Sequence, residues 1–147
     1  MINNIMTTMK KVFISFDYEN DRDYRYLLAA LSANPDIEFS FEDNTSKEIN
    51  SENVDRVKAV LTRKINKSDI TLVIIGKEAN QLHPDAELIG YKNWQNFEVA
   101  KSVEAGNKIV GVKLDWSYES PEELIGHCDA WAHSFKLSEI TKALNQA

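Results

Sequence analysis

Short apolar runs alternate with stretches of helical periodicity along most of the chain. The clearest run is 70–76 (ITLVIIG), and similar runs lie at 11–16 and 108–114. An almost wholly apolar run of this length is typical of a strand that is buried on both faces of a sheet. Two weaker strands are predicted at 37–41, where apolar and polar residues alternate, and at 130–136.

Helices are predicted between these strands. Leucine and tyrosine residues recur at helical spacing within 20–34, and apolar residues do so within 51–65, 93–106 and 137–145. An asparagine–proline pair and a glycine–asparagine pair supply stop signals for the first and third helices. Ser51 is the expected cap of the second helix.

This alternation predicts an α/β fold with a flavodoxin-like, three-layer architecture. A parallel five-stranded sheet of order 2-1-3-4-5 would be covered by helices on both faces. We expect residues 10–147 to form one domain and residues 1–9 to be a disordered lead-in. In a sheet of this order, ligands bind beyond the carboxyl ends of strands 1 and 3. The connection at 77–92 lies on that edge and is long enough to be a binding loop.

Charge and composition narrow the classes of partner. The chain has 147 residues, a formal net charge of −6 and no dense cluster of Lys and Arg, which argues against nucleic acid as a partner. Its single cysteine, Cys128, cannot form an internal disulfide, as suits a reducing compartment. No segment has the apolar core of a signal peptide or the length of a membrane span. We therefore expect a cytoplasmic protein that contacts neither nucleic acid nor membrane.

The predicted helix at 93–106 carries two residues that do not fit its apolar stripe. At 100° per residue, Phe97, Val99 and Ala100 fall on one side together with Val103. Trp94 and Glu98 fall outside this stripe, about 40° apart, as positions i and i+4 do. Because this helix begins at the carboxyl edge of the sheet, we expect the pair to face the ligand crevice there.

Four stretches of the chain match the pattern of one domain family. They are the strand with acidic positions after it (KVFISFDYENDRDY), a helix–strand junction (RKINKSDITLVIIG), a W-x-x-x-E motif (WQNFE, Trp94 to Glu98) and a helix with its following strand (EVAKSVEAGNKIVGVKL). In this order they resemble TIR domains, and most closely the small TIR-like proteins of the bacterial Thoeris anti-phage system. The resemblance covers about residues 10–114.

The resemblance implies an activity and a site. Enzymatic TIR proteins cleave the nicotinamide–ribose bond of NAD+, and the Thoeris members are implied to make a cyclic ADP-ribose-type signal for a partner effector that senses it. The catalytic residue of the family maps to Glu98 and its companion aromatic residue to Trp94. NAD+ is then the substrate, no cofactor is expected, and a homo-oligomer is among the implied assemblies.

Further candidates for substrate binding lie at the same edge of the predicted sheet. Phe16, Asp17 and Tyr18 end the first strand there, and Glu42 and Asp43 begin the loop after the second. In TIR domains that loop borders the site.

Other polar residues are assigned structural roles. Asp21 and Asp23 are interpreted as charges that complement the start of a helix. Ser15 and Ser68 are interpreted as structural, and the pair His127-Cys128 lacks the further ligands that a metal site needs.

Two alternatives to the NAD+-cleaving enzyme stay open. One is a non-catalytic TIR module that works by self-association, which consumption of NAD+ would exclude. The other is an enzyme similar to nucleoside deoxyribosyltransferases, in which a Glu attacks an N-glycosidic bond. A panel of nucleoside substrates would identify it.

Overall fold

The computed structural model of the chain describes residues 10–17, 20, 21, 26, 29, 30, 33, 39–42 and 53–147, with the backbone alone for 39–42. The expected lead-in at 1–9 and most of the helix predicted at 20–34 lie outside the described residues. So do Tyr18, Asp43 and the side chain of Glu42.

The described strands form one sheet in which all neighbours run parallel. They are β1 (Lys10–Ser15), β2 (Phe39–Glu42), β3 (Ile70–Ile75), β4 (Lys108–Lys113) and β5 (Ala130–Ala132). Their order is β2-β1-β3-β4-β5, the order expected of a flavodoxin-like sheet. Four strands of four to six residues form the body of the sheet, and the three-residue β5 extends it beyond β4.

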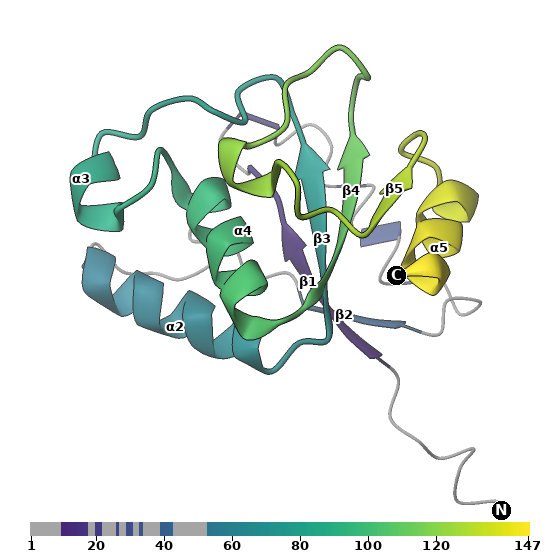
Figure 1. Cartoon of the computed structure of the whole chain (residues 1–147), viewed down its shortest axis with the longest axis horizontal. Helices are drawn as coiled ribbons and strands as arrows, with labels where there is room; N and C mark the ends of the chain where they lie inside the picture. Colours follow the sequence, from purple (N-terminus) through teal and green to yellow (C-terminus); the bar gives the residue numbers. More distant parts are fainter. Residues whose placement is uncertain are drawn as a thin grey trace, which may run out of the picture.

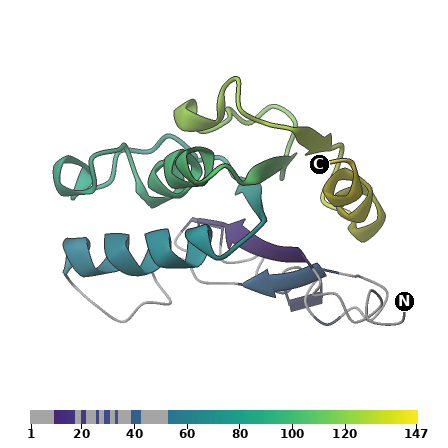
Figure 2. The same cartoon turned by 60° about the horizontal axis from the view of Figure 1, so that its bottom comes forward.

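Helices cover the two faces of this sheet (Figures 1 and 2). The two long ones on one face are α2 (Val54–Asn66) and α4 (Trp94–Ala105), which contact each other. On the other face α5 (Leu137–Gln146) packs beside β4 and β5. The α/β prediction with a parallel sheet and flanking helices is therefore confirmed.

Local sequence explains where the two long helices begin and end. The N-cap of α2 is Asn53, whose side chain accepts a hydrogen bond from the Arg56 amide at 3.1 Å. The expected cap, Ser51, lies outside the described residues, and the helix begins after Asn53. Asn93 caps α4 in the same way, and Gly106 ends it at a φ of 78°, in the left-handed region.

The connections between strands hold two short helical elements that the apolar pattern did not predict. The connection after β3 contains α3 (Ala86–Ile89), and the one after β4 contains the 3₁₀ turn η4 (Glu122–Leu124). η4 packs against α4, so α4 is covered by the sheet, by α2 and by η4. None of the helices in the described part of the chain is long and apolar enough to cross a membrane.

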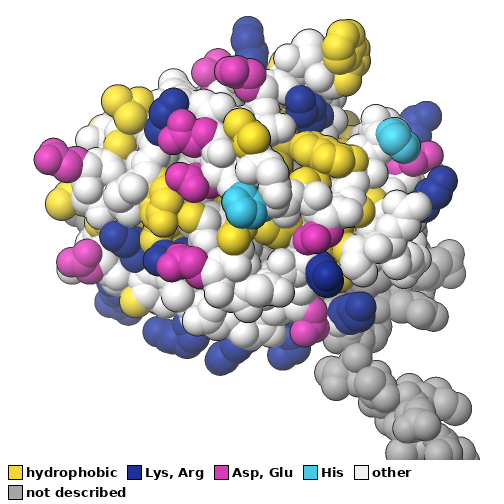
Figure 3. Space-filling model, in the orientation of Figure 1, with side chains coloured by type: hydrophobic (Ala, Val, Ile, Leu, Met, Phe, Trp, Pro, Cys, Tyr) yellow, Lys and Arg dark blue, Asp and Glu magenta, His cyan; other side chains and the backbone are white. Residues whose placement is uncertain are grey.

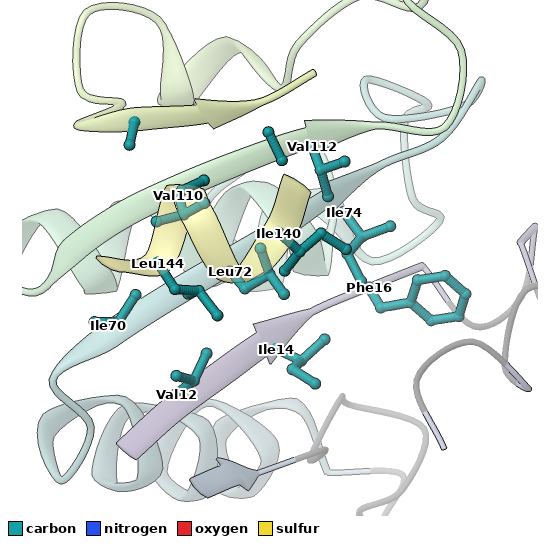
Figure 4. Packing of buried hydrophobic residues seen from close by; sticks show 13 residues of the cluster. Val12, Ile14, Phe16, Ile70, Leu72, Ile74, Val110, Val112, Ile140 and Leu144 are labelled. Atoms are coloured by element: carbon teal, nitrogen blue, oxygen red, sulfur yellow. The ribbon is translucent and has the colours of Figure 1, made fainter. Parts of the chain in front are cut away.

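Side chains that alternate along each strand build a core on both faces of the sheet. On the α5 face, β1 and β3 contribute Val12, Ile14, Leu72 and Ile74, which pack toward Ile140 of α5 (Figure 4). The residues between them point to the α2–α4 face, where the core includes Phe13, Val57, Leu61, Val73, Ile75, Phe97 and Val99.

The outer side of α2 is basic and solvated. Figure 3 shows Lys and Arg side chains along the lower edge of the molecule, where Figure 1 draws α2. Arg56 and Arg63 are exposed, whereas Val57, Leu61 and Ile65 of the same helix are buried. The basic residues are therefore the polar side of an amphipathic helix.

Candidate active site

The candidate site lies at the carboxyl ends of the neighbouring parallel strands β1 and β3, where the sheet order changes direction relative to the sequence. This is the switch point at which parallel α/β sheets bind ligands. α4 follows β3 through the connection at 76–93, so its first turns lie at this edge. The geometry thus brings the W-x-x-x-E motif and the end of β1 together.

Glu98 is buried at this point and is held by β1. Its side chain is 1 % exposed, and Ser15 Oγ donates a hydrogen bond of 2.6 Å to Glu98 Oε1. A short hydrogen bond from a hydroxyl to a carboxylate is a strong one, so it fixes the position of the carboxylate. One turn later, Ser102 Oγ donates to the Glu98 carbonyl at 2.8 Å and lies 2.7 Å from Thr71 Oγ1 of β3, which ties the helix to the sheet.

The burial of Glu98 differs from the expectation of a helix with one packed face. Gln95, Asn96 and Ser102 are buried as well, each with hydrogen bonds to other elements. The sheet, α2 and η4 surround α4 and exclude water from much of it. Its buried polar side chains therefore form hydrogen bonds with these neighbouring segments instead of with water. The apolar period of one helix carries no information about these neighbours, which come from other parts of the chain.

Gln95 joins the two strand ends. Its Nε2 donates to the carbonyl of Ser15 at 3.1 Å and to that of Ile74 at 2.8 Å. These bonds satisfy carbonyls where the β1–β3 ladder ends and assign the amide orientation. Among the described residues, Gln95 Oε1 then accepts no hydrogen bond, although the side chain is only 5 % exposed.

Asp21 lies over the end of β3. A Cβ at position 76 would overlap its carboxylate, so Gly76 is required for this approach. Burial, and then repulsion from Asp17 and Glu78, raise the pKa of Asp21 to about 6. Its Oδ2 is the second buried acceptor that has no hydrogen-bond partner in the described part of the chain. The interpretation of Asp21 as a helix-start charge did not anticipate this position.

Trp94 begins α4 and packs against the core between α2 and α4. Its indole packs edge-on to Phe97, with ring centroids 5.6 Å apart, and to His83 at 6.4 Å. It is partly buried and packs against the cluster that contains Val57 and Leu61. The contacts of the described residues therefore give Trp94 a packing role at the start of α4.

The side chains of Phe16 and Asp17, which directly follow β1, have different surroundings. Phe16 is 3 % exposed and belongs to the core on the α5 face, opposite to the face that carries Glu98 (Figure 4). Asp17 accepts hydrogen bonds from the backbone and side chain of Asn20, whose amide also donates to Gln81 at 2.9 Å. Asp17 thus holds the turn that presents Asp21.

Three residues of this site were not singled out from the sequence as functional. They are Ser15, Gln95 and Asp21. Ser15 lies near the end of an apolar run. A hydroxyl at the carboxyl end of a parallel strand is a signal from which a functional residue could have been predicted. Ser68, by contrast, caps the end of α2 by donating to the Lys64 carbonyl at 2.9 Å, as a structural serine does.

Metal-binding residues are not gathered in the described part of the chain. No group of three His, Cys, Asp or Glu side chains there could hold an ion. His127 and Cys128 lie at the opposite edge of the sheet, beside an open polar hollow of about 320 Å³ that Asn107 and Asp129 also line. Burial raises the pKa of the Cys128 thiol, which disfavours the reactive thiolate.

Comparison with known proteins identifies the family of this fold. Residues 13–118 match the family model described as the Thoeris protein ThsB, TIR-like domain. The chain is also 24 % identical over 110 residues to a Bacillus cereus (strain MSX-D12) protein named "Putative cyclic ADP-D-ribose synthase ThsB1". That match covers 72 % of this chain, and the chain spans about half (52 %) of the relative's length.

Solved structures share the fold at low sequence identity. A 2-deoxyribosyltransferase from Bacillus psychrosaccharolyticus is similar with a TM-score of 0.59 and 15 % identity, over 88 % of this chain and 90 % of that one. A CMP N-glycosidase from Clostridium botulinum, BcmB, gives 0.55 and 13 %, over 92 % and 98 %. A prokaryotic SEFIR domain gives 0.56 and 14 %, over 93 % and 94 %.

Proposed function

The chain belongs to the TIR-like domain family of the Thoeris protein ThsB, and from this premise we propose that it cleaves the nicotinamide–ribose bond of NAD+ with Glu98 as its catalytic residue. The observation that carries the proposal is the buried Glu98 carboxylate, fixed by Ser15 at the switch point of the sheet. Membership of the family and the name of the Bacillus cereus relative support the choice of substrate.

The chemistry of NAD+ explains why one carboxylate is enough. When the bond between C1′ and the pyridinium nitrogen breaks, its electron pair goes to that nitrogen and nicotinamide leaves as a neutral molecule. A leaving group that is already cationic needs no general acid, unlike the oxygen of a sugar glycoside. The remaining task is to stabilise the positive charge that develops on the ribose, which a preorganised carboxylate does.

The environment of Glu98 suits this task. A carboxylate that is removed from water interacts more strongly with a developing cation than an exposed one does. Ser15 Oγ holds Oε1 in place before the substrate binds, so the carboxylate itself needs little reorientation. Because Glu98 is 1 % exposed, a substrate that contacts it must displace part of the surrounding packing.

We further propose that the ribosyl cation is trapped within the same molecule. Attack on C1′ by a nucleophilic atom of the substrate's own ADP moiety gives a cyclic ADP-ribose-type product, with release of a proton. Attack by water would instead give linear ADP-ribose, so a site that excludes water favours the cyclic product. In anti-phage defence such a product would be the signal to a partner effector that senses it.

The test is to incubate concentrated protein with NAD+ and to resolve the products by chromatography and mass spectrometry. We expect free nicotinamide and a second product that is lighter than ADP-ribose by one water. If purified protein is silent, extracts of phage-infected cells that express it are assayed in the same way. If NAD+ is not consumed in either case, the proposed cleavage of NAD+ is wrong, and the scaffold and the deoxyribosyltransferase-like enzyme are the two alternatives left.

A second assay distinguishes the proposed cleavage of NAD+ from a deoxyribosyltransferase-like activity. Nucleosides and deoxynucleosides are supplied together with a free base, and transfer of the sugar to that base is followed. Base exchange without consumption of NAD+ would identify a deoxyribosyltransferase-like enzyme. The solved deoxyribosyltransferase with this fold supplies a positive control for that assay.

A further inference from the structure

Two buried acceptor atoms at the site accept no hydrogen bond from the described residues. They are Asp21 Oδ2 and Gln95 Oε1, on side chains that are 8 % and 5 % exposed. A buried polar atom without a partner costs about 1–3 kcal/mol, so native structures supply one for nearly every such atom. Two at one edge of the sheet point to a ligand that donates hydrogen bonds there.

Both atoms belong to the place where β1 and β3 end. Gln95 is anchored by the carbonyls of Ser15 and Ile74, and Asp21 lies over Gly76, two residues beyond Ile74. Ser15 also holds the Glu98 carboxylate through its hydroxyl. The two acceptors and the Glu98 carboxylate therefore all lie at the carboxyl ends of β1 and β3.

Two further carboxylates, those of Asp17 and Glu78, repel a negative charge on Asp21. They are close enough to raise its pKa. A ligand group that donates hydrogen bonds and carries positive charge nearby would relieve both the repulsion and the unpaired acceptors.

We propose that Asp21 Oδ2 and Gln95 Oε1 form a subsite that accepts hydrogen bonds from the vicinal hydroxyls of the ribose next to the scissile bond. A vicinal diol offers two adjacent O–H donors, and the pyridinium that this ribose carries in NAD+ supplies the positive charge. The inference rests on the proposed function and assigns the substrate's position within that site. Asp21 and Gln95 are binding residues here, and Glu98 remains the catalytic one.

The test uses binding, so that turnover does not interfere. The probe is an NAD+ analogue in which a methylene group replaces the oxygen of the nicotinamide ribose ring, which makes it uncleavable but leaves the diol. A second probe lacks the two hydroxyls of that ring. Dissociation constants are measured by calorimetry for the wild type, Asp21→Ala, Asp21→Asn and the control Glu104→Gln, which removes an exposed charge at the far end of α4.

We expect Asp21→Ala to weaken binding of the diol probe at least tenfold and Asp21→Asn to weaken it less, because an amide oxygen can still accept a hydrogen bond. Glu104→Gln should bind like the wild type. For the probe without hydroxyls, all four proteins should agree within about twofold. Equal affinities of the wild type and Asp21→Ala for the diol probe would overturn the subsite, as would an equal loss with both probes.

Failure of the subsite differs from failure of the proposed function. If NAD+ is cleaved and Asp21→Ala binds the diol probe normally, only the subsite is wrong. If NAD+ is not cleaved but binding depends on both Asp21 and the diol, the subsite stands and the catalytic proposal falls. If the wild type does not bind the diol probe at millimolar concentration, the subsite is overturned whatever the turnover assay gives. Circular dichroism of each variant confirms that it is folded.

Discussion

Replacing Asp21 by Asn should stabilise the protein at neutral pH, and the gain should shrink in acid. Asn keeps the shape of the side chain but removes the charge that burial, Asp17 and Glu78 disfavour. The pKa of Asp21 is about 6 in the folded chain and 3.8 in its ordinary state. The folded protein thus holds the proton more tightly than the unfolded chain does.

The sign and size of the effect follow from this difference. The wild type is relatively most stable when Asp21 is protonated, and it loses stability as pH rises from about 4 to about 6. Above that range the ionised Asp21 costs about 3 kcal/mol, since one pKa unit corresponds to 1.36 kcal/mol. At pH 4.5 the corresponding cost is about 1 kcal/mol.

The assay is urea denaturation of the wild type and Asp21→Asn at pH 8 and pH 4.5. We expect the variant to unfold at higher urea at both values, with the larger difference in free energy at pH 8. Glu104→Gln, an exposed charge change, serves as the control and should shift little at either pH. A variant that is less stable than the wild type at pH 8, or a difference that does not change with pH, would refute the argument from burial and repulsion.

Three further substitutions test the contacts around the site. Ser15→Ala should lower the unfolding free energy by about 1–3 kcal/mol and slow nicotinamide release at least tenfold, because the buried Glu98 loses its 2.6 Å hydrogen bond. Unchanged turnover would contradict the role of Ser15 in positioning Glu98. Trp94→Ala should lower the unfolding free energy, measured by urea denaturation, by about 1–3 kcal/mol and leave KM for NAD+ within twofold. A large rise in KM would show instead that the indole contacts the substrate. Gly111→Ala should cost about 1–3 kcal/mol, because a Cβ there would lie 2.6 Å from Trp131 Cζ3; a thermal midpoint equal to that of the wild type would contradict this contact.

The strands could be predicted because a strand that is buried on both faces consists of a short run of apolar residues, which is visible in the local sequence. The apolar run at 70–76 became β3 (Ile70–Ile75), in which every residue is buried, and the run at 108–114 became β4. β5 ends at Ala132, earlier than the predicted 136, and the short α3 has too few residues to show a period. Short elements depend on tertiary contacts more than on pattern.

The site could be predicted only in part. The sequence pattern placed Glu98 at the carboxyl edge of the sheet, outside the apolar stripe and facing the ligand crevice beside Trp94. The structure buries Glu98 against Ser15 and gives Trp94 its contacts with Phe97 and His83. These partners are up to 83 positions apart in the chain, and no local period encodes such contacts.

The central claim is that Glu98 is the catalytic carboxylate, and one rate comparison tests it most directly. Nicotinamide release from NAD+ is measured for the wild type, Glu98→Gln and Glu104→Gln at equal concentration, after circular dichroism has shown that all three are folded. We expect the wild type and Glu104→Gln to release nicotinamide at similar rates, and Glu98→Gln to release it at least a hundredfold more slowly. Release by Glu98→Gln at the wild-type rate would contradict the central claim.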